Sequence, residues 1–167
     1  HTLRDEILTD MQQKFQKPVI GMGHSLGGVL IFLAACVAPQ LFQHIILLDS
    51  PVYGPLKGMV LRLTKWLNRI EDLTPAARTK NRRTFWPDKA SALAYFQQRS
   101  LFSHFDPDCL QDYVDYGLEP SENGWQLYFE RNIEYQIYKT LPDNLASYRH
   151  CQRPPTTLIY GSHSYLF

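Results

Sequence analysis

The 167-residue sequence contains 44% hydrophobic and 13% aromatic residues, a composition that is typical of a globular domain and excludes an intrinsically disordered chain. Its formal net charge of +1 gives no electrostatic reason to expect a nucleic acid or an anionic membrane as a partner. We therefore expect a small-molecule substrate.

The three cysteines, Cys36, Cys109 and Cys151, are odd in number, far apart and without a C-x-x-C pair. This spacing predicts neither a disulfide nor a zinc site. We therefore expect a reducing compartment, with a cytoplasmic location, and we predict no metal and no cofactor.

The first predicted element is an amphipathic helix over residues 2–16. Its apolar residues recur with helical spacing on one stripe, and charged and amide residues occupy the opposite face. The stripe consists of Leu3, Ile7, Leu8, Met11 and Phe15. Such a helix is expected to cover a sheet.

A nucleophile motif follows the next predicted strand. Residues 17–22 form a short apolar run that predicts a buried strand, and residues 23–27 read GHSLG, which has G-x-S-x-G spacing. This spacing places a serine at a sharp turn between a strand and a helix, and the flanking glycines avoid Cβ clashes there. Residues 25–38 are apolar and predict the helix, so the order strand, turn and helix is complete.

Residues 44–49 form a second apolar run without alternation, which predicts a strand of a parallel sheet that is buried on both faces. No charged side chain lies between Lys17 and Asp49. A membrane span is nevertheless not predicted, because Pro18 and several glycines interrupt any stretch near the ~20 residues that a span needs. The two predicted strands and the helix between them form a β-α-β unit.

Through residues 19–28 and 47–51 the chain resembles the α/β-hydrolase superfamily, and within it the small serine hydrolases that carry a cap. The resemblance implies an α/β fold, with a mostly parallel sheet and a helical cap inserted between two strands. It assigns residues 1–52 to the core, 53–153 to the cap and 154–167 to the return into the sheet.

The apolar periodicity becomes helical after residue 53. Helices are predicted over residues 56–67, 89–98, 106–118 and 131–141, with an extended piece over 125–129. The first of them is expected to bury Met59, Leu63, Trp66 and Leu67. The many aromatic residues of the cap either line an apolar pocket above Ser25 or fix the cap to the sheet.

Residues 154–161 predict a further buried strand. The resemblance implies a longer protein, with further strands and a second oxyanion donor before His1 and the catalytic histidine after Phe167. A sheet of only three parallel strands would also leave unpaired edges, so we expect these residues not to fold alone.

The candidate catalytic residues are Ser25 as the nucleophile, the Leu26 backbone N–H as an oxyanion donor, and Asp49 as the acid. An acid after Phe167 is the competing assignment, because Tyr165 stands where many relatives have the carboxylate. Asp49 also fits a structural role as the cap of the turn into Pro51.

The histidines within the sequence are poor candidates for the general base. His24 is too close to Ser25 to turn back onto its hydroxyl, and His163 is a weak alternative. The others are expected to be structural or exposed: His44, His104 and His150.

These residues predict a serine hydrolase that cleaves an ester, thioester or related acyl bond of a small, apolar substrate through an acyl-Ser25 intermediate. Three alternatives stay open: a non-catalytic binding module, a carbon–carbon bond hydrolase and an acyltransferase. The sequence makes no prediction of oligomeric state.

Overall fold

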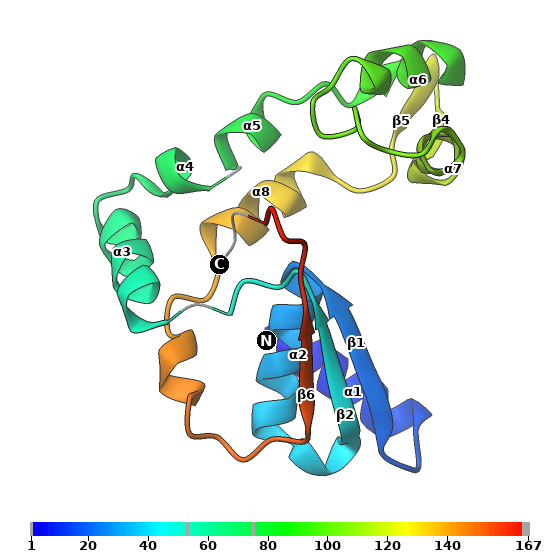
Figure 1. The fold of residues 1–167 in the computed structure, drawn as a ribbon. Coiled ribbons are helices and arrows are strands. Elements are labelled where there is room, and N and C mark those ends of the chain that lie inside the picture. Colours follow the sequence, from blue (N-terminus) through cyan, green and yellow to red (C-terminus); the bar gives the residue numbers. More distant parts are fainter. Residues whose placement is uncertain (1, 53, 75, 165–167) are drawn as a thin grey trace. The chain divides into compact units, whose positions relative to one another are not determined.

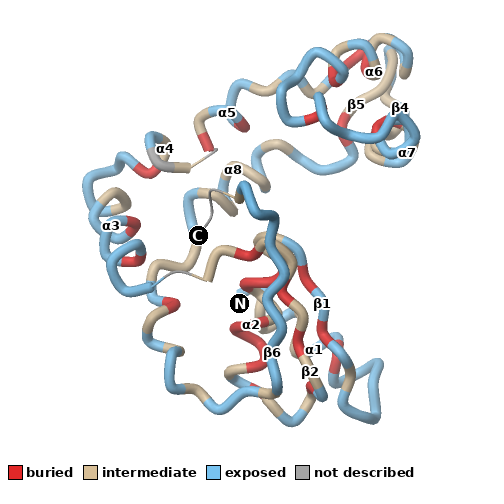
Figure 2. The backbone as a smooth tube through the Cα atoms, viewed as in Figure 1, coloured by how far each residue is buried: buried red, intermediate tan, exposed pale blue. Residues whose placement is uncertain are grey.

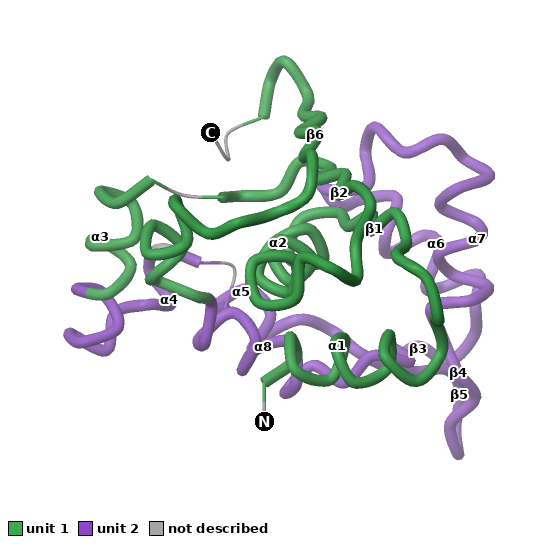
Figure 3. Tube along the Cα trace, turned by 90° about the horizontal axis from the view of Figure 1, so that it is seen from below, with its two compact units in different colours: residues 1–62, 142–167 green, residues 63–141 purple. Residues whose placement is uncertain are grey.

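The computed structural model describes residues 2–52, 54–74 and 76–164. These residues divide into two compact units (Figure 3). Unit 1 contains residues 1–62 and 142–167, and unit 2 contains residues 63–141.

Unit 1 is built on a three-stranded parallel sheet (Figure 1). Its strands are β1 (Val19–His24), β2 (Phe42–Leu48) and β6 (Thr156–Ile159), in the order β1-β2-β6. Both strand pairs are parallel, so the carboxyl ends of the strands lie at the same edge of the sheet. The predicted α/β class and parallel sheet are confirmed.

Helices α1 (Leu3–Lys14) and α2 (Leu26–Val37) lie on the same side of this sheet (Figures 1 and 3). Helix α2 packs on β1 and β2, and α1 packs on α2. The apolar stripe predicted for α1 is confirmed at Met11, which is buried, whereas Leu3 and Phe15 are exposed. The shared core consists of Met11, Val29, Phe32, Leu33, Ala34, Ala35, Phe42, Ile45, Leu47 and Leu145.

The other side of the sheet is largely uncovered among the described residues (Figure 2). In β2 the buried residues Ile45 and Leu47 alternate with half-buried ones, and all residues of β6 are exposed. The prediction that both strands are buried is therefore wrong for β6 and holds for one face of β2. The reason is that α1 and α2 cover one face only, while β6 forms an edge of the sheet.

Helix α3 (Pro55–Trp66) has the predicted bounds within one or two residues but buries a different face. Met59 is 62% exposed and Trp66 is 77% exposed, and Leu63 and Leu67 are also exposed, so the predicted inward face is wrong. The buried residues of α3 are Gly58 and Leu61. A Cβ atom on Gly58 would lie 2.7 Å from the Asp143 carbonyl oxygen, so close backbone packing selects this face.

Four short helical segments lie between the larger elements. They are α4 (Ile70–Leu73), α5 (Ala76–Lys80) and the 3₁₀ turns η1 (Pro39–Leu41) and η2 (Leu145–Tyr148). Within the described part of the chain, no helix is both long enough and apolar enough to cross a membrane.

Unit 2 combines helices with a small antiparallel sheet, of which only the extended piece over residues 125–129 was predicted, at β5. The sheet has the order β3-β5-β4, in which β4 and β5 form a hairpin. The elements are β3 (Phe85–Trp86), α6 (Lys89–Gln97), α7 (Pro107–Gly117), β4 (Leu118–Ser121), β5 (Gly124–Leu127) and α8 (Arg131–Lys139). The predicted helices correspond to α6, α7 and α8.

The core of unit 2 is aromatic. The rings of Trp86, Phe96, Phe102 and Tyr113 pack on one another with centroid separations of 4.9–5.1 Å. Trp86 is fully buried. The start predicted for α7 is confirmed, because the Asp106 side chain accepts a hydrogen bond from the Asp108 N–H at 2.9 Å.

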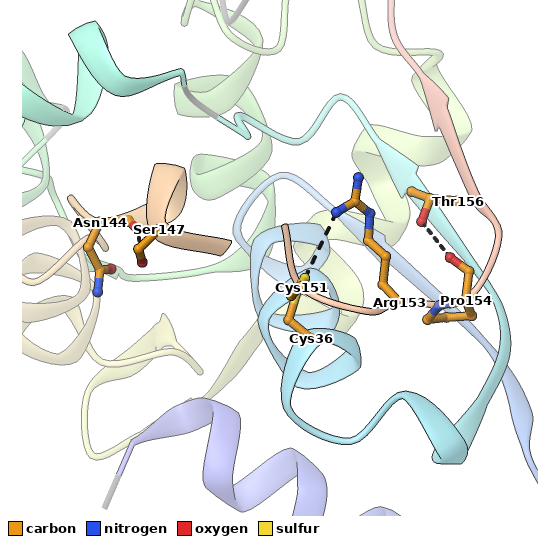
Figure 4. Close-up of a disulfide and its surroundings, with 7 residues drawn as sticks. All are labelled: Cys36, Asn144, Ser147, Cys151, Arg153, Pro154 and Thr156. Atoms are coloured by element: carbon orange, nitrogen blue, oxygen red, sulfur yellow. Dashed lines mark hydrogen bonds between the residues drawn. A yellow bond between two sulfur atoms is a disulfide. The ribbon is translucent and has the colours of Figure 1, made fainter. Parts of the chain in front are cut away.

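Cys36 and Cys151 form a disulfide, so the prediction of unpaired cysteines is wrong for these two residues (Figure 4). The bond joins the last turn of α2 to the segment that leads into β6. Its residues are 115 positions apart, and only the folded sheet brings their Cα atoms to 5.4 Å, which is why spacing gave no signal. Cys109 is free and exposed.

Candidate active site

Ser25 occupies the turn between β1 and α2. Its backbone angles are φ 50° and ψ −119°, a region that a residue with a Cβ atom enters only when the surroundings hold it there. One restraint is visible: the Ser25 N–H donates to the Leu48 carbonyl oxygen at 2.9 Å. The side chain is half-buried. This is the strained strand-to-helix turn that the G-x-S-x-G motif predicts.

The glycines around Ser25 differ in what they do. A Cβ atom on Gly23 would lie 2.4–2.5 Å from backbone atoms of Gly27 and Gly28, so this position has no room for a side chain. A Cβ atom on Gly27 would meet nothing within 4 Å. The close approach falls instead on Gly28, where a Cβ atom would lie 1.9 Å from the Ser50 Oγ. The expected steric role is therefore confirmed for Gly23 and wrong for Gly27.

Leu26 is the first residue of α2. Its N–H has no acceptor within the helix, because the first turn of a helix leaves its amides unpaired. The helix dipole adds positive potential at the same point. Leu26 therefore directly follows Ser25 in the chain and has an N–H without an acceptor in the helix, which is the arrangement expected of an oxyanion donor.

Asp49 directly follows β2 and also has a positive φ, of 43°. Its N–H donates to the Ile159 carbonyl oxygen of β6 at 2.7 Å. The carboxylate oxygen Oδ1 is buried and has no hydrogen-bond partner among the described residues. A buried carboxylate oxygen without a donor is costly, so this oxygen is suited to receive one. Because β1 and β2 pair in parallel, Asp49 and Ser25 follow neighbouring strand ends.

No histidine of the described segments hydrogen-bonds to Ser25 or Asp49. The His44 Nε2 contacts the Thr157 Oγ1 at 2.8 Å, and the His104 Nδ1 contacts a neighbouring serine hydroxyl at 3.0 Å. The His150 Nε2 lies 2.9 Å from the side chain of the preceding arginine. His163 is exposed in a turn after β6. The Tyr165 position lies outside the described residues.

A cavity of about 260 Å³ lies within unit 2. Aromatic residues form much of its lining, together with Arg82 and Glu134, which make a paired salt bridge. Burial raises the pKa of the Tyr113 hydroxyl, another lining group. The aromatic lining residues are Tyr113, Tyr116, Tyr128 and Phe129. These four aromatic residues lie in the segment whose many aromatic residues the sequence singled out, whereas the Arg82–Glu134 pair joins distant segments and had no sequence signal.

Metal chemistry has no candidate site in the described ranges. Residues 2–52, 54–74 and 76–164 contain no group of three or more histidine, cysteine, aspartate or glutamate side chains that could hold a metal ion.

The sequence profile of the alpha/beta hydrolase fold matches residues 1–167. The chain belongs to the α/β-hydrolase fold family. The predicted superfamily is thereby confirmed.

Curated relatives of this α/β-hydrolase chain come from fungi. An abhydrolase domain-containing protein of Alternaria alternata, AFT2-1, is 30% identical over 113 residues, which cover 67% of this chain and 38% of that protein. The type I acyl-CoA thioesterase mpaH of Penicillium roqueforti is 23% identical over 118 residues, covering 66% of this chain and 23% of that protein. The chain thus spans well under half the length of these relatives.

Two solved structures share the fold. The thioesterase domain from the curacin biosynthetic pathway aligns with a TM-score of 0.68 at 21% identity, over 99% of this chain and 56% of that domain. E-2-(acetamidomethylene)succinate hydrolase aligns with a TM-score of 0.70 at 16% identity, over 95% of this chain and 64% of that one. At these identities the similarity establishes the fold alone.

Proposed function

We propose that this chain carries the nucleophile of a serine hydrolase that cleaves an ester, thioester or related acyl bond. The observation that carries the proposal is the backbone of Ser25, which stands at φ 50° between a parallel strand and the first turn of a helix. Such a turn exposes the serine hydroxyl above the sheet and directs a helix N-terminus at the same point.

The proposed reaction has two steps. The Ser25 Oγ adds to the carbonyl carbon of the substrate, and its proton passes through a general base to the leaving oxygen or sulfur as the old bond breaks. Water then cleaves the acyl-serine ester and restores the hydroxyl. In both steps the Leu26 N–H donates a hydrogen bond to the oxyanion.

Asp49 is proposed as the acid that orients the catalytic base. Its buried Oδ1 has no donor among the described residues, and an imidazole N–H would supply one. The proposal is supported by the hydrogen bond from the Ser25 N–H to the carbonyl oxygen of Leu48, the residue directly before Asp49. A purely structural role for Asp49 would leave its Oδ1 without a donor among the described residues.

A thioester is the favoured substrate class within this proposal. It is supported by the name of a similar protein, the Penicillium acyl-CoA thioesterase. Residues 53–153 are proposed as the cap that selects an apolar acyl group. The cytoplasmic location stays a prediction, and the Cys36–Cys151 disulfide removes the cysteine argument for it.

The nucleophile is tested by labelling the full-length protein with a serine-directed fluorophosphonate and locating the adduct by mass spectrometry. We expect one adduct on Ser25, abolished in Ser25→Ala and unchanged in Ser162→Ala, whose serine is exposed on a loop. Absence of an adduct under conditions that label a known esterase would support a non-catalytic binding module instead.

The acid is tested separately with Asp49→Asn, which keeps the size of the side chain. We expect turnover of a p-nitrophenyl ester and of an acyl-thioester to fall by about 10⁴-fold, as for an amide replacing a triad aspartate. Unchanged turnover would mean that the acid lies elsewhere. Assays with an added alcohol acceptor and with a β-diketone distinguish acyl transfer and carbon–carbon cleavage from hydrolysis.

A further inference from the structure

Ser50, next to Asp49, is a fully buried polar residue that the proposed reaction does not use. Burying a hydroxyl is unfavourable unless it is hydrogen-bonded, and alanine would fill the same place without that cost. The Ser50 Oγ donates to the Leu48 carbonyl oxygen at 3.0 Å and lies 3.4 Å from the Gly23 carbonyl oxygen. Its acceptors therefore belong to the ends of both strands that lead to the candidate catalytic residues.

The Leu48 carbonyl oxygen receives two hydrogen bonds. One comes from the Ser50 hydroxyl at 3.0 Å, and the other comes from the N–H of the nucleophile Ser25 at 2.9 Å. A carbonyl oxygen has two lone pairs, so both donors are accommodated. The backbone of Ser25 and the side chain of Ser50 thus hydrogen-bond to the same atom.

Gly28, in the first turn of α2, also packs closely against the Ser50 side chain and the Gly23 carbonyl oxygen. A Cβ atom on Gly28 would lie 1.9 Å from the Ser50 Oγ, 2.7 Å from the Ser50 Cβ and 2.8 Å from the Gly23 carbonyl oxygen. The glycine therefore leaves the space that the hydroxyl fills. Strand β1, strand β2 and helix α2 meet around this one hydroxyl.

We infer that Ser50 is a positioning residue. It keeps the strained Ser25 turn in a fixed position relative to the end of β2, and therefore relative to Asp49. This inference rests on the proposed function for its effect on rate, because a displaced nucleophile reacts slowly even when the fold survives. Its structural half, the restraint on the Ser25 backbone, does not depend on activity.

The experiment compares Ser50→Ala with the wild type in the full-length protein. We expect phosphonylation of Ser25 by a fluorophosphonate to slow by about ten- to a hundredfold. For a p-nitrophenyl ester, kcat is expected to fall while KM stays within about twofold, because uniform binding is unchanged. Hydrogen exchange at the Ser25 amide is expected to speed up.

Ile45→Val is the matched control, because Ile45 is fully buried in β2, the strand that precedes Ser50, and its side chain carries no polar group. It shortens a core side chain but keeps the Ser50 hydroxyl, so its labelling rate should equal that of the wild type. If Ser50→Ala labels as fast as this control and its Ser25 amide exchanges as slowly, the inference is overturned while the proposed function stands. If the wild type is not labelled but Ser50→Ala still speeds exchange at Ser25, the proposed function fails and the restraint is supported.

Discussion

The two units hold their chains in place by different means. In unit 1 the position of the candidate nucleophile depends on small residues and main-chain hydrogen bonds, namely Gly23, Gly28, Ser50 and the Ser25 N–H. In unit 2 the core depends on large rings that pack on one another, with Trp86 at the centre. Backbone packing tolerates almost no substitution, whereas ring packing tolerates many as long as volume is conserved. A motif can therefore be recognised in unit 1 and not in unit 2.

The largest expected effect tests the ring packing of unit 2. Trp86→Ala removes a fully buried ring that lies 5.1–5.4 Å from the rings of Tyr95 and Phe96, so unfolding free energy should fall by about 3–5 kcal/mol. Trp86→Phe should cost clearly less, because the Trp86 Nε1 has no hydrogen-bond partner among the described residues and only volume is lost. Urea unfolding measures both. Equal losses in the two variants would mean that the ring volume does not determine the stability of unit 2.

The second effect concerns the disulfide of unit 1. Cys36→Ser removes a bond that joins residues 115 positions apart, and we expect a loss of about 2–4 kcal/mol in unfolding free energy. Cys109→Ser is the matched control, since Cys109 is free and exposed. Thermal unfolding with and without a reducing agent gives a second reading. If the reductant leaves the wild-type midpoint unchanged, the bond does not stabilise this unit.

The third effect separates the two glycines of the motif. Gly23→Ala brings a Cβ atom to 2.4 Å from backbone, so it should destabilise unit 1 by about 1–3 kcal/mol or more and slow labelling of Ser25. Gly27→Ala meets no atom within 4 Å and lies within α2, so it should stabilise the protein by about 0.5–1 kcal/mol. Chemical denaturation of the pair is the measurement. A loss of stability in Gly27→Ala as large as that in Gly23→Ala would mean that both glycines of the motif are needed to avoid a Cβ clash.

The two units also differ in how much of their structure the sequence predicts. The strand, turn and helix around Ser25 were predictable, because their chemistry depends on glycine, serine and short apolar runs that are local in sequence. Gly28 directly follows the motif, but its contact with Ser50 had no sequence signal, since folding brings the first turn of α2 to the segment after β2. The buried face of α3 was predicted wrongly, because a backbone contact at Gly58 outweighs the larger apolar side chains.

In unit 2 the helices follow from apolar periodicity and from the Asp106 cap. Apart from the extended piece predicted at β5, the antiparallel sheet does not. Its strands are two to four residues long, and such runs are too short for alternation to be recognised. The Cys36–Cys151 bond and the Arg82–Glu134 pair were missed for a further reason: each joins segments that only the tertiary structure brings together.

The smallest expected effect concerns the polar end of α1 in unit 1. The hydrogen bond from the Thr2 side chain, and then those from Arg4, lower the pKa of Asp5 to about 2, against an ordinary value of 3.8. Thr2 and Asp5 form a reciprocal capping box at the start of the helix. Because the folded pKa lies below the unfolded one, this contribution is fully present above about pH 4 and is lost as the pH falls through about 2.

Thr2→Ala removes the principal cause of this shift, and Thr2→Ser keeps the hydroxyl. We expect Thr2→Ala to be less stable than Thr2→Ser above pH 4, and the gap between them to shrink steadily toward pH 2 as Asp5 becomes protonated in both. Thermal unfolding by circular dichroism across this range measures the gap. A gap that stays constant with pH would mean that the Asp5 carboxylate takes no part in the cap, and that α1, unlike the Ser25 turn, is held by its apolar stripe alone.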